Sequence, residues 1–307
     1  MRALVVDRSS DAGVRIGRAP EPRPAPDEAV IRVSAFSVNP GDLAALAGMS
    51  DGTVPGWEAA GHIVTAAADG SGPDVGTAVA TFGYAGAWAE YRAVRTSMLG
   101  TAPADADLAA VSTVPVAASS ALRALRELGA VLGRRVIITG ATGGVGRYAI
   151  QLARLAGAEP IAVTSAAEEH GEELRALGAQ AVVADPAAAA LSFGVIDTVG
   201  GDLLVRAFDR LDDRGVLVAL GNLDTGGSRF AHGALMATSG RNRRTIVSFH
   251  QFDGTPLAPD FTWLSHRLAD GTLRPSLAWR GPWSRADEAI GEMSRGRVRG
   301  KVVMEIA

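Results

Sequence analysis

The sequence contains no cysteine among its 307 residues. Without thiols the protein cannot form a disulfide, a cysteine-ligated zinc site or a thiolate nucleophile. Histidine is also scarce, and the five histidines form no HxxxH or HExxH pair. A metal site would therefore need ligands from distant parts of the chain. We expect a protein that binds no metal.

Long apolar runs and a strong net charge are missing as well. No apolar stretch approaches the roughly 18 residues that suggest a membrane span, and no basic segment followed by an apolar core begins the chain. The net charge of -3 gives no electrostatic reason to expect nucleic acid as a partner. With 47% hydrophobic residues the composition is that of a soluble globular protein, long enough for two domains. We expect it in the cytoplasm.

The segment Arg135 to Gly157, RRVIITGATGGVGRYAIQLARLAG, is the most informative part of the chain. Its short apolar run, Val136 to Ile138, predicts a strand buried on both faces, and the helical spacing of later apolar residues predicts an amphipathic helix. The glycines between them let the backbone approach a phosphate, while the helix start offers unpaired N–H groups and a positive dipole end. This context predicts a dinucleotide site, with a purely structural turn as the alternative.

The spacing of apolar residues divides the chain into two patterns. Up to about Thr113, short strand-like runs broken by Gly, Pro and Asp predict an antiparallel barrel or sandwich. A helix is expected from about Val116 to Leu128. From there to about Phe249, strands alternate with helices, which predicts an α/β doubly wound parallel sheet. The remaining residues contain two expected helices and a strand, and we expect them to pack back on the N-terminal domain.

Several motifs occur along the chain: SVNPGDL (Ser37 to Leu43), PGWEAAGHIV (Pro55 to Val64), GAWAEY (Gly86 to Tyr91), ITGATGGVGRYAIQLARLAGA (Ile138 to Ala158), DTVGG (Asp197 to Gly201) and GKVV (Gly300 to Val303). Together they resemble the zinc-independent quinone oxidoreductase and enoyl reductase branch of the medium-chain dehydrogenase/reductase superfamily. The resemblance implies a GroES-like β-rich catalytic domain, a Rossmann domain and a cofactor cleft where they meet. We expect residues 1–114 to begin the catalytic domain, 115–248 to form the Rossmann domain and 249–307 to complete the catalytic domain.

Two positions depart from the zinc-dependent members of the superfamily. By the resemblance, Asn39 stands at a cysteine ligand position and Trp57 at a histidine ligand position. Neither an amide nor an indole is a useful zinc ligand, so alcohol oxidation would lose its Lewis acid. We therefore favour hydride transfer to the β carbon of an enone, or to a quinone. Two alternatives stay open: a non-catalytic NADPH-binding protein, and a pathway enzyme for a polyketide or acyl substrate, with or without net reduction.

Asn39 is the first catalytic candidate, because the resemblance places such an asparagine near the nicotinamide ribose and the substrate carbonyl. Its amide would donate to the developing oxyanion, whereas the plainer alternative is that Asn-Pro forms a turn. We interpret the following LAALAGMSDGTV as a loop without the tyrosines that relatives carry. The proton donor stays open among Asp42, Tyr84, His250 and solvent. The expected substrate pocket consists of Trp57, Tyr84, Phe249 and His250.

The expected cofactor is NADPH, with NADH as the alternative. NAD sites usually carry a carboxylate about 20 residues past the glycines, but here the second strand ends in Thr164 and Ser165. Glu169 stands where NADPH-binding relatives often have lysine, so a phosphate contact would come from His170, Arg175 or the arginines of residues 241–244. The full set of expected cofactor-binding residues is Asn39, Thr113, Gly140, Thr142, Gly143, Gly144, Val145, Thr164, Ser165, His170, Val199, Leu220, Gly221, Asn222 and Lys301.

The segment TIVSF, Thr245 to Phe249, would be the edge strand of the parallel sheet. An unpaired edge rich in β-branched residues is a liability that pairing with a second copy removes, and the resemblance implies such pairing. We therefore expect a homodimer formed through this strand. The other expected partner is a small enone, quinone or acyl substrate.

Overall fold

The computed structural model describes residues 1–224, 226–252 and 254–306. The chain divides into two compact units, each treated separately below. Unit 1 comprises Met1–Ser119 and Gly254–Ala307, and unit 2 comprises Ser120–Asp253, so both boundaries lie a few residues beyond the expected ones. In the part of the chain that the structure describes, no helix combines the length and the apolar character needed to cross a membrane.

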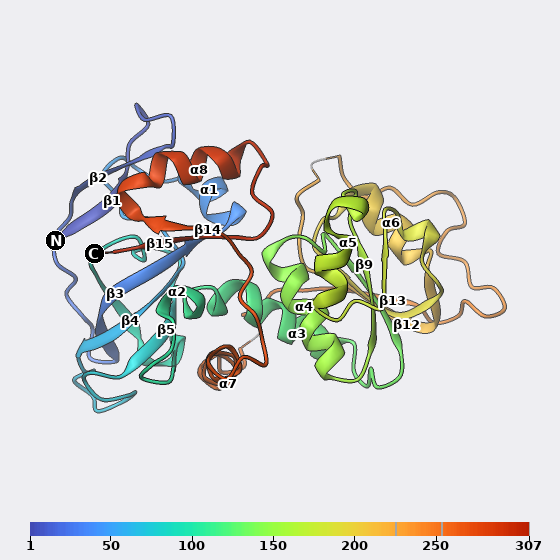
Figure 1. The fold of residues 1–307 in the computed structure, drawn as a ribbon, viewed down its shortest axis with the longest axis horizontal. Coiled ribbons are helices and arrows are strands. Elements are labelled where there is room, and N and C mark those ends of the chain that lie inside the picture. Colours follow the sequence, from blue (N-terminus) through green and yellow to red (C-terminus); the bar gives the residue numbers. More distant parts are fainter. Residues whose placement is uncertain (225, 253, 307) are drawn as a thin grey trace. The chain divides into compact units, whose positions relative to one another are not determined.

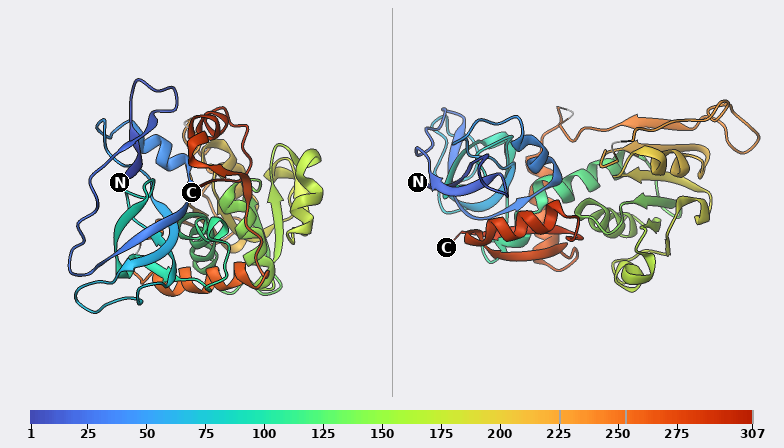
Figure 2. Two further views of the ribbon diagram at one scale, coloured as in Figure 1. Left: turned by 60° about the vertical axis from the view of Figure 1, so that its left-hand side comes forward. Right: turned by 90° about the horizontal axis from the view of Figure 1, so that it is seen from above.

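Unit 1 is built on a seven-stranded, mainly antiparallel sheet. Strand β15, the last strand in the sequence, pairs antiparallel with β3, so the C-terminal part of the chain completes a sheet that the N-terminal part begins. Figure 2 shows the two chain ends in this same unit. The strand order is β14 (Leu277–Pro282), β15 (Lys301–Glu305), β3 (Glu28–Val38), β4 (Glu58–Thr65), β5 (Ala78–Phe82) and β7 (Leu99–Thr101), with β6 (Tyr91–Arg95) also on β3, and β1 (Arg2–Val6) pairs separately with β2 (Val14–Arg18).

The helices of unit 1 cover this sheet. Helix α8 packs against β2 and β15, while α7 packs against β7, and α8 is the red helix beside β14 and β15 in Figure 1. Beneath α8, the rings of Trp88 and Trp283 pack on Phe36 at centroid distances of 5.8 and 6.5 Å. The helical segments are α1 (Pro40–Leu46), α2 (Leu108–Val111), α7 (Ala258–Ala269) and α8 (Ala286–Ser294), with a π-helical turn η2 (Val114–Ala118) and the 3₁₀ turns η1 (Thr96–Met98) and η4 (Trp283–Arg285).

The residues directly after Asn39 form helix α1, so the expected loop of residues 43–54 is wrong for its first four residues, whereas residues 47–54 lie outside helices and strands. Asn39 is the N-cap residue with an extended backbone, and Pro40 occupies the first helical position, where its missing N–H costs nothing. The third helical residue, Asp42, accepts a hydrogen bond from the Asn39 backbone N–H at 2.8 Å. The Asn-Pro pair therefore starts a helix, and the acidic residue three positions after the cap was the signal for it.

Unit 2 contains a six-stranded parallel sheet, which confirms the expected doubly wound fold. The order of strands reverses between β8 and β11, the topological switch point where ligands of such sheets bind. The order is β10 (Ala181–Val183), β9 (Glu159–Val163), β8 (Arg135–Thr139), β11 (Ser192–Asp197), β12 (Leu211–Ala219) and β13 (Thr245–Ser248), and the helical segments are α3 (Ser119–Glu127), α4 (Gly144–Leu155), α5 (Ala167–Ala176), η3 (Pro186–Ala188) and α6 (Gly201–Phe208).

Two glycines of the turn from β8 to α4, Gly140 and Gly146, have no room for a side chain. Gly140 has a φ of +58°, a backbone conformation that favours glycine. A Cβ on Gly146 would lie 2.4 Å from the Gly140 carbonyl oxygen and 2.7 Å from the Ala141 Cα. The first turn of α4 therefore packs directly on the backbone that leaves β8.

Gly146→Ala should lower the free energy of unfolding by about 1–3 kcal/mol, because the added methyl overlaps fixed backbone atoms. The matched control is Gly171→Ala in α5, whose Cβ would meet the mobile end of Arg175 at 3.1 Å. That control should gain about 0.5–1 kcal/mol from reduced backbone entropy. Urea unfolding measures both changes. Equal effects at the two positions would contradict the close approach at Gly146.

Candidate active site

One buried residue, Asp197, joins the carboxyl ends of β8, β11 and β12 through its side chain and its backbone carbonyl. The Thr139 hydroxyl donates to Asp197 Oδ1 at 2.6 Å, and the Gly200 N–H donates to Oδ2 at 2.8 Å. The Asp197 carbonyl accepts the N–H groups of Leu220 and Gly221. Burial raises the pKa of Asp197, while its hydrogen bonds oppose that rise. Sequence analysis placed the DTVGG motif but missed this role, although a polar residue ending a buried apolar run was the available signal.

The same edge of the sheet fits a dinucleotide. Helix α4 begins after Gly143, whose backbone is extended, and neither Gly143 nor Gly144 places a side chain over the unpaired N–H groups of the first turn. The Arg147 side chain supports the turn by donating to the Thr142 carbonyl at 2.9 Å. The structure brings together at this edge the predicted residues Gly140, Thr142, Gly143, Gly144, Val145, Thr164, Ser165, Val199, Leu220, Gly221 and Asn222.

The surroundings of Thr164 bear on the ribose end of such a cofactor. His170 lies between two carboxylates, with Nε2 3.6 Å from Glu169 and Nδ1 3.5 Å from Glu173. Glu173 also binds the Arg147 guanidinium, which lowers the pKa of Glu173. The arginines of residues 241–244 precede β13, at the amino end of the parallel strands. They lie at the amino ends of the parallel strands, whereas Thr164 lies at the carboxyl ends, so the suggestion that they contact a ribose phosphate is wrong.

In unit 1, a closed hydrogen-bond network surrounds Asn39. The Lys301 ammonium donates to Asn39 Oδ1 at 2.5 Å and to Glu58 Oε1 at 2.6 Å. The Asn39 amide nitrogen donates to Glu58 Oε1 and to Asp42 Oδ2, both at 2.9 Å. An ammonium only donates and a carboxylate only accepts, so these partners fix which end of the amide carries the oxygen. All four side chains are buried.

The two carboxylates of this network are held by further donors. Glu58 accepts the Ser37 hydroxyl on Oε1 and the Val116 N–H on Oε2, the latter at 2.7 Å. Asp42 accepts the Trp57 N–H on Oδ1 at 3.0 Å. Burial raises the pKa of Asp42 to about 7, and the Glu58 charge also raises it, while the Asn39 donors and Lys301 lower it. Asp42 therefore titrates near neutral pH.

This arrangement bears on the expected roles of Asn39 and Lys301. Both N–H bonds of the Asn39 amide already point at carboxylates, so donation to a substrate oxyanion, which stays a prediction, would require one of them to be released. Lys301, expected near the cofactor, uses its ammonium inside the network. Thr113, also expected near the cofactor, is fully buried and its hydroxyl donates to the Ala110 carbonyl at 2.7 Å. These contacts favour structural roles within unit 1 for Lys301 and Thr113, in place of contact with the cofactor.

The donor set around Asn39 does not suit zinc. The Asn39 oxygen faces an ammonium, and both Glu58 oxygens accept hydrogen bonds. The Trp57 ring lies against Gly41, where a Cβ would come within 2.4 Å of the indole. Across residues 1–224, 226–252 and 254–306, no group of three or more His, Cys, Asp or Glu side chains is placed to hold a metal ion.

The expected pocket residues belong to different units. Trp57 is half-buried in unit 1, and Tyr84, on the turn after β5, is 62% exposed with its ring edge-on to Phe82 at 5.4 Å. Phe249 and His250 directly follow β13 in unit 2, where the His250 ring contacts Phe252 at 5.3 Å. The residues that sequence analysis missed in unit 1 are Ser37, Glu58 and Arg92. Glu58 and Lys301 belong to the PGWEAAG and GKVV motifs, but these motifs do not predict that the two side chains contact each other.

Comparisons with known proteins agree with this architecture. Residues 25–104 match the family described as the alcohol dehydrogenase GroES-like domain, and residues 177–304 match the family described as zinc-binding dehydrogenase. The chain is 25% identical to a chloroplastic quinone-oxidoreductase homolog of Spinacia oleracea, over 92% of this chain and 91% of that protein. It is 28% identical to an acryloyl-coenzyme A reductase of Sulfurisphaera tokodaii, over 73% of this chain and 78% of that protein. The solved structure of the quinone oxidoreductase from Coxiella burnetii has the same fold, with a TM-score of 0.84, 23% identity and coverage of 100% and 99% of the two chains.

Lys301→Met should cost about 3–5 kcal/mol of stability, because it leaves the Glu58 carboxylate buried without its cation. Glu58→Gln should also destabilise the protein, by stranding the ammonium. The double variant should lose clearly less than the sum of the single losses, as measured by chemical denaturation. As a control, Arg280→Met breaks exposed ion pairs to Asp107 and Glu305 and should cost at most about 1 kcal/mol. Additive losses for Lys301 and Glu58 would contradict direct coupling.

Proposed function

The chain belongs to the medium-chain dehydrogenase/reductase superfamily, in its quinone oxidoreductase and enoyl reductase branch, and from this premise we propose an NADPH-dependent, zinc-free reductase of α,β-unsaturated carbonyls or quinones. The observation that carries the proposal is the network of Asn39, Asp42, Glu58 and Lys301. Its donors and acceptors satisfy one another around Asn39, which by the resemblance stands at a cysteine ligand position of the zinc-dependent members. A reaction that needs no Lewis acid on an alkoxide fits such a site.

Each unit has its own part in the proposed reaction. A bound nicotinamide supplies the hydride. The glycine turn between β8 and α4 binds the diphosphate of the cofactor through backbone N–H groups. Ser165 and Thr164 contact the ribose, and the lack of a carboxylate at this strand end favours NADPH over NADH, although Glu169 and Glu173 beside His170 act against a phosphate.

In the proposed reaction, side chains of unit 1 stabilise the negative charge of the enolate and supply the proton that neutralises it. Asn39 stabilises the oxyanion if one of its N–H bonds turns from a carboxylate to the substrate. For protonation we favour Tyr84 over Asp42. The pKa of Asp42 is suitable for a general acid at neutral pH, but the carboxyl is only 1% exposed, and a proton donor must reach the substrate.

The similarity to an acryloyl-coenzyme A reductase also supports an acyl substrate. A pathway enzyme acting on an acyl or polyketide intermediate is therefore the second candidate. Product mass distinguishes the possibilities, because reduction of a double bond adds two hydrogens and a rearrangement adds none.

Purified protein should oxidise NADPH in the presence of a small enone, an enoyl thioester or a quinone, and the product of a double-bond reduction should gain two hydrogens. NADPH should bind more tightly than NADH in calorimetry. Asn39→Ala should lower kcat by about 10²–10³, the typical effect of losing an oxyanion donor, with little change in the NADPH dissociation constant. Tight NADPH binding without turnover on the whole panel would instead indicate a non-catalytic binding protein. Unchanged kcat in Asn39→Ala would remove the oxyanion role.

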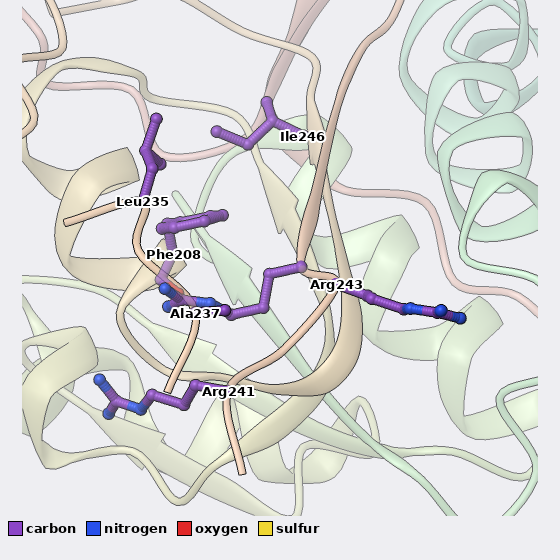
Figure 3. A pocket seen from close by; sticks show the side chains of 7 residues that line it. Phe208, Leu235, Ala237, Arg241, Arg243 and Ile246 are labelled. Atoms are coloured by element: carbon purple, nitrogen blue, oxygen red, sulfur yellow. The ribbon is translucent and has the colours of Figure 1, made fainter. Parts of the chain in front are cut away.

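We also propose a homodimer formed through the β13 edge of unit 2. Exposed apolar side chains gather beside this strand, including Leu235 (65% exposed) and Ile246 (40% exposed). They line a hollow of about 370 Å³ with Phe208, Ala237, Arg241, Arg243 and Arg244. Figure 3 shows Phe208, Leu235 and Ile246 around this hollow, while Arg241 and Arg243 extend from it in different directions. Pairing of two β13 strands satisfies the open edge and covers these side chains.

Light scattering at micromolar concentration should give the mass of a dimer, and Ile246→Glu should shift it toward the monomer because a carboxylate is costly in an apolar interface. Val75→Glu is the matched control, since Val75 is an exposed apolar residue of unit 1 and the change should leave the mass unaltered. A monomeric mass for the unmodified protein would overturn the dimer.

A further inference from the structure

Strand β6 carries an arginine on its buried face. The side chains of Arg92 and Val94 point inward, and Arg92 is 3% exposed. Arginine is almost never fully buried unless its donors are satisfied, because desolvating a charge is costly. The contacts of Arg92 therefore indicate what its position stabilises.

The guanidinium joins two separate backbone segments. Its Nη1 donates to the Trp57 carbonyl at 3.2 Å, and its Nη2 donates to the Ala85 carbonyl at 3.2 Å. The turn that carries Tyr84 lies directly on it, since a Cβ on Gly83 would come within 2.6 Å of Nη2. The Gly83 N–H also donates to the Trp57 carbonyl, at 2.8 Å. Arg92 thus ties the backbone of Trp57 to the turn that bears Tyr84.

The burial of Arg92 and the charges near it restrain the backbone of Trp57. Among the described residues, the acceptors that Arg92 contacts are neutral oxygens, the third being the Thr81 hydroxyl at 3.1 Å, and the buried Nε has no hydrogen-bond partner. Burial lowers the pKa of Arg92 to about 10, while the charges of Asp42 and Glu58 act through space in the opposite direction. The Trp57 peptide lies between the two charged groups, with its N–H on Asp42 and its carbonyl on Arg92. Loss of either bond would leave a charged group poorly solvated, so the backbone of Trp57 is held from both sides.

We propose that Arg92 is a positioning residue that fixes the spacing of Trp57 and Tyr84 and thereby sets which acyl or enone substrates the enzyme accepts by their width. The role of these two side chains as pocket walls rests on the proposed function. The tie itself is a property of unit 1. A planar guanidinium reaches two carbonyls that point to different nitrogens, whereas the single nitrogen of lysine cannot reproduce that geometry. The fork of the side chain therefore matters more than its charge.

Hydrogen exchange followed by mass spectrometry tests the tie without any turnover. In the unmodified protein, the amides of residues 83–87 should exchange slowly, at rates closer to those of β4 than to those of an open turn. Arg92→Gln and Arg92→Lys should both speed this exchange by about tenfold or more. Thr81→Val is the matched control, because it removes an Arg92 partner that belongs to neither wall, and it should leave the exchange of residues 83–87 unchanged. Fast exchange in the unmodified protein, a result that does not depend on any variant folding, would overturn the proposal.

Substrate selectivity tests whether the spacing of Trp57 and Tyr84 sets the width of the substrates that the enzyme accepts. The ratio of kcat/KM for but-3-en-2-one to that for 4-phenylbut-3-en-2-one should change by about fivefold or more in Arg92→Gln and Arg92→Lys, and stay constant in Thr81→Val. Retention of the original ratio by Arg92→Lys would show that charge alone suffices and would overturn the positioning role. If the unmodified protein reduces neither enone nor any quinone, the proposed function fails. The exchange experiment still decides whether Arg92 holds the two segments together.

Discussion

The contact between the Lys301 ammonium and the Glu58 carboxylate is the interaction on which unit 1 depends. Either charge alone would cost several kcal/mol in the buried position it occupies, so the two must come together when the chain folds. Lys301 begins β15 and Glu58 begins β4, and both strands flank β3. The pair therefore couples the return of the C-terminal segment to the completion of the sheet. The orientation of Asn39 follows from it, because the amide oxygen has to face the ammonium.

Unit 2 has a comparable constraint in Asp197. Its carboxylate binds groups from the ends of two neighbouring strands, and its carbonyl binds the segment after β12. These bonds hold the turns at the switch point in fixed positions before any ligand arrives. Such preorganisation reduces the ordering that cofactor binding requires. In both units a buried carboxylate thus aligns the backbone around the proposed chemistry.

The network in unit 1 also explains how this site differs from a metal centre. A metal ion would place a large positive charge beside the substrate, whereas here the positive charges of Lys301 and Arg92 are set against the carboxylates of Glu58 and Asp42. The pKa of Asp42 near neutrality means that the charge of the network changes within the physiological pH range. A site of this kind is suited to reactions in which modest charge develops and protons move, such as reduction of a conjugated double bond.

Local sequence determined much of this protein. The apolar runs of β8 and β11 predict buried parallel strands, and the glycines between β8 and α4 predict the dinucleotide edge, because periodicity and turn chemistry act between neighbours in the chain. The capping signal of α1 was equally local, and it was misinterpreted. Tertiary structure alone decided that Lys301 meets Asn39, 262 residues away, and that the guanidinium of Arg92 joins Trp57 to the turn of Tyr84. It also placed the arginines before β13 at the far edge of the sheet. A buried charge takes as partners whatever groups the packed elements bring near it, and chain order does not encode that proximity.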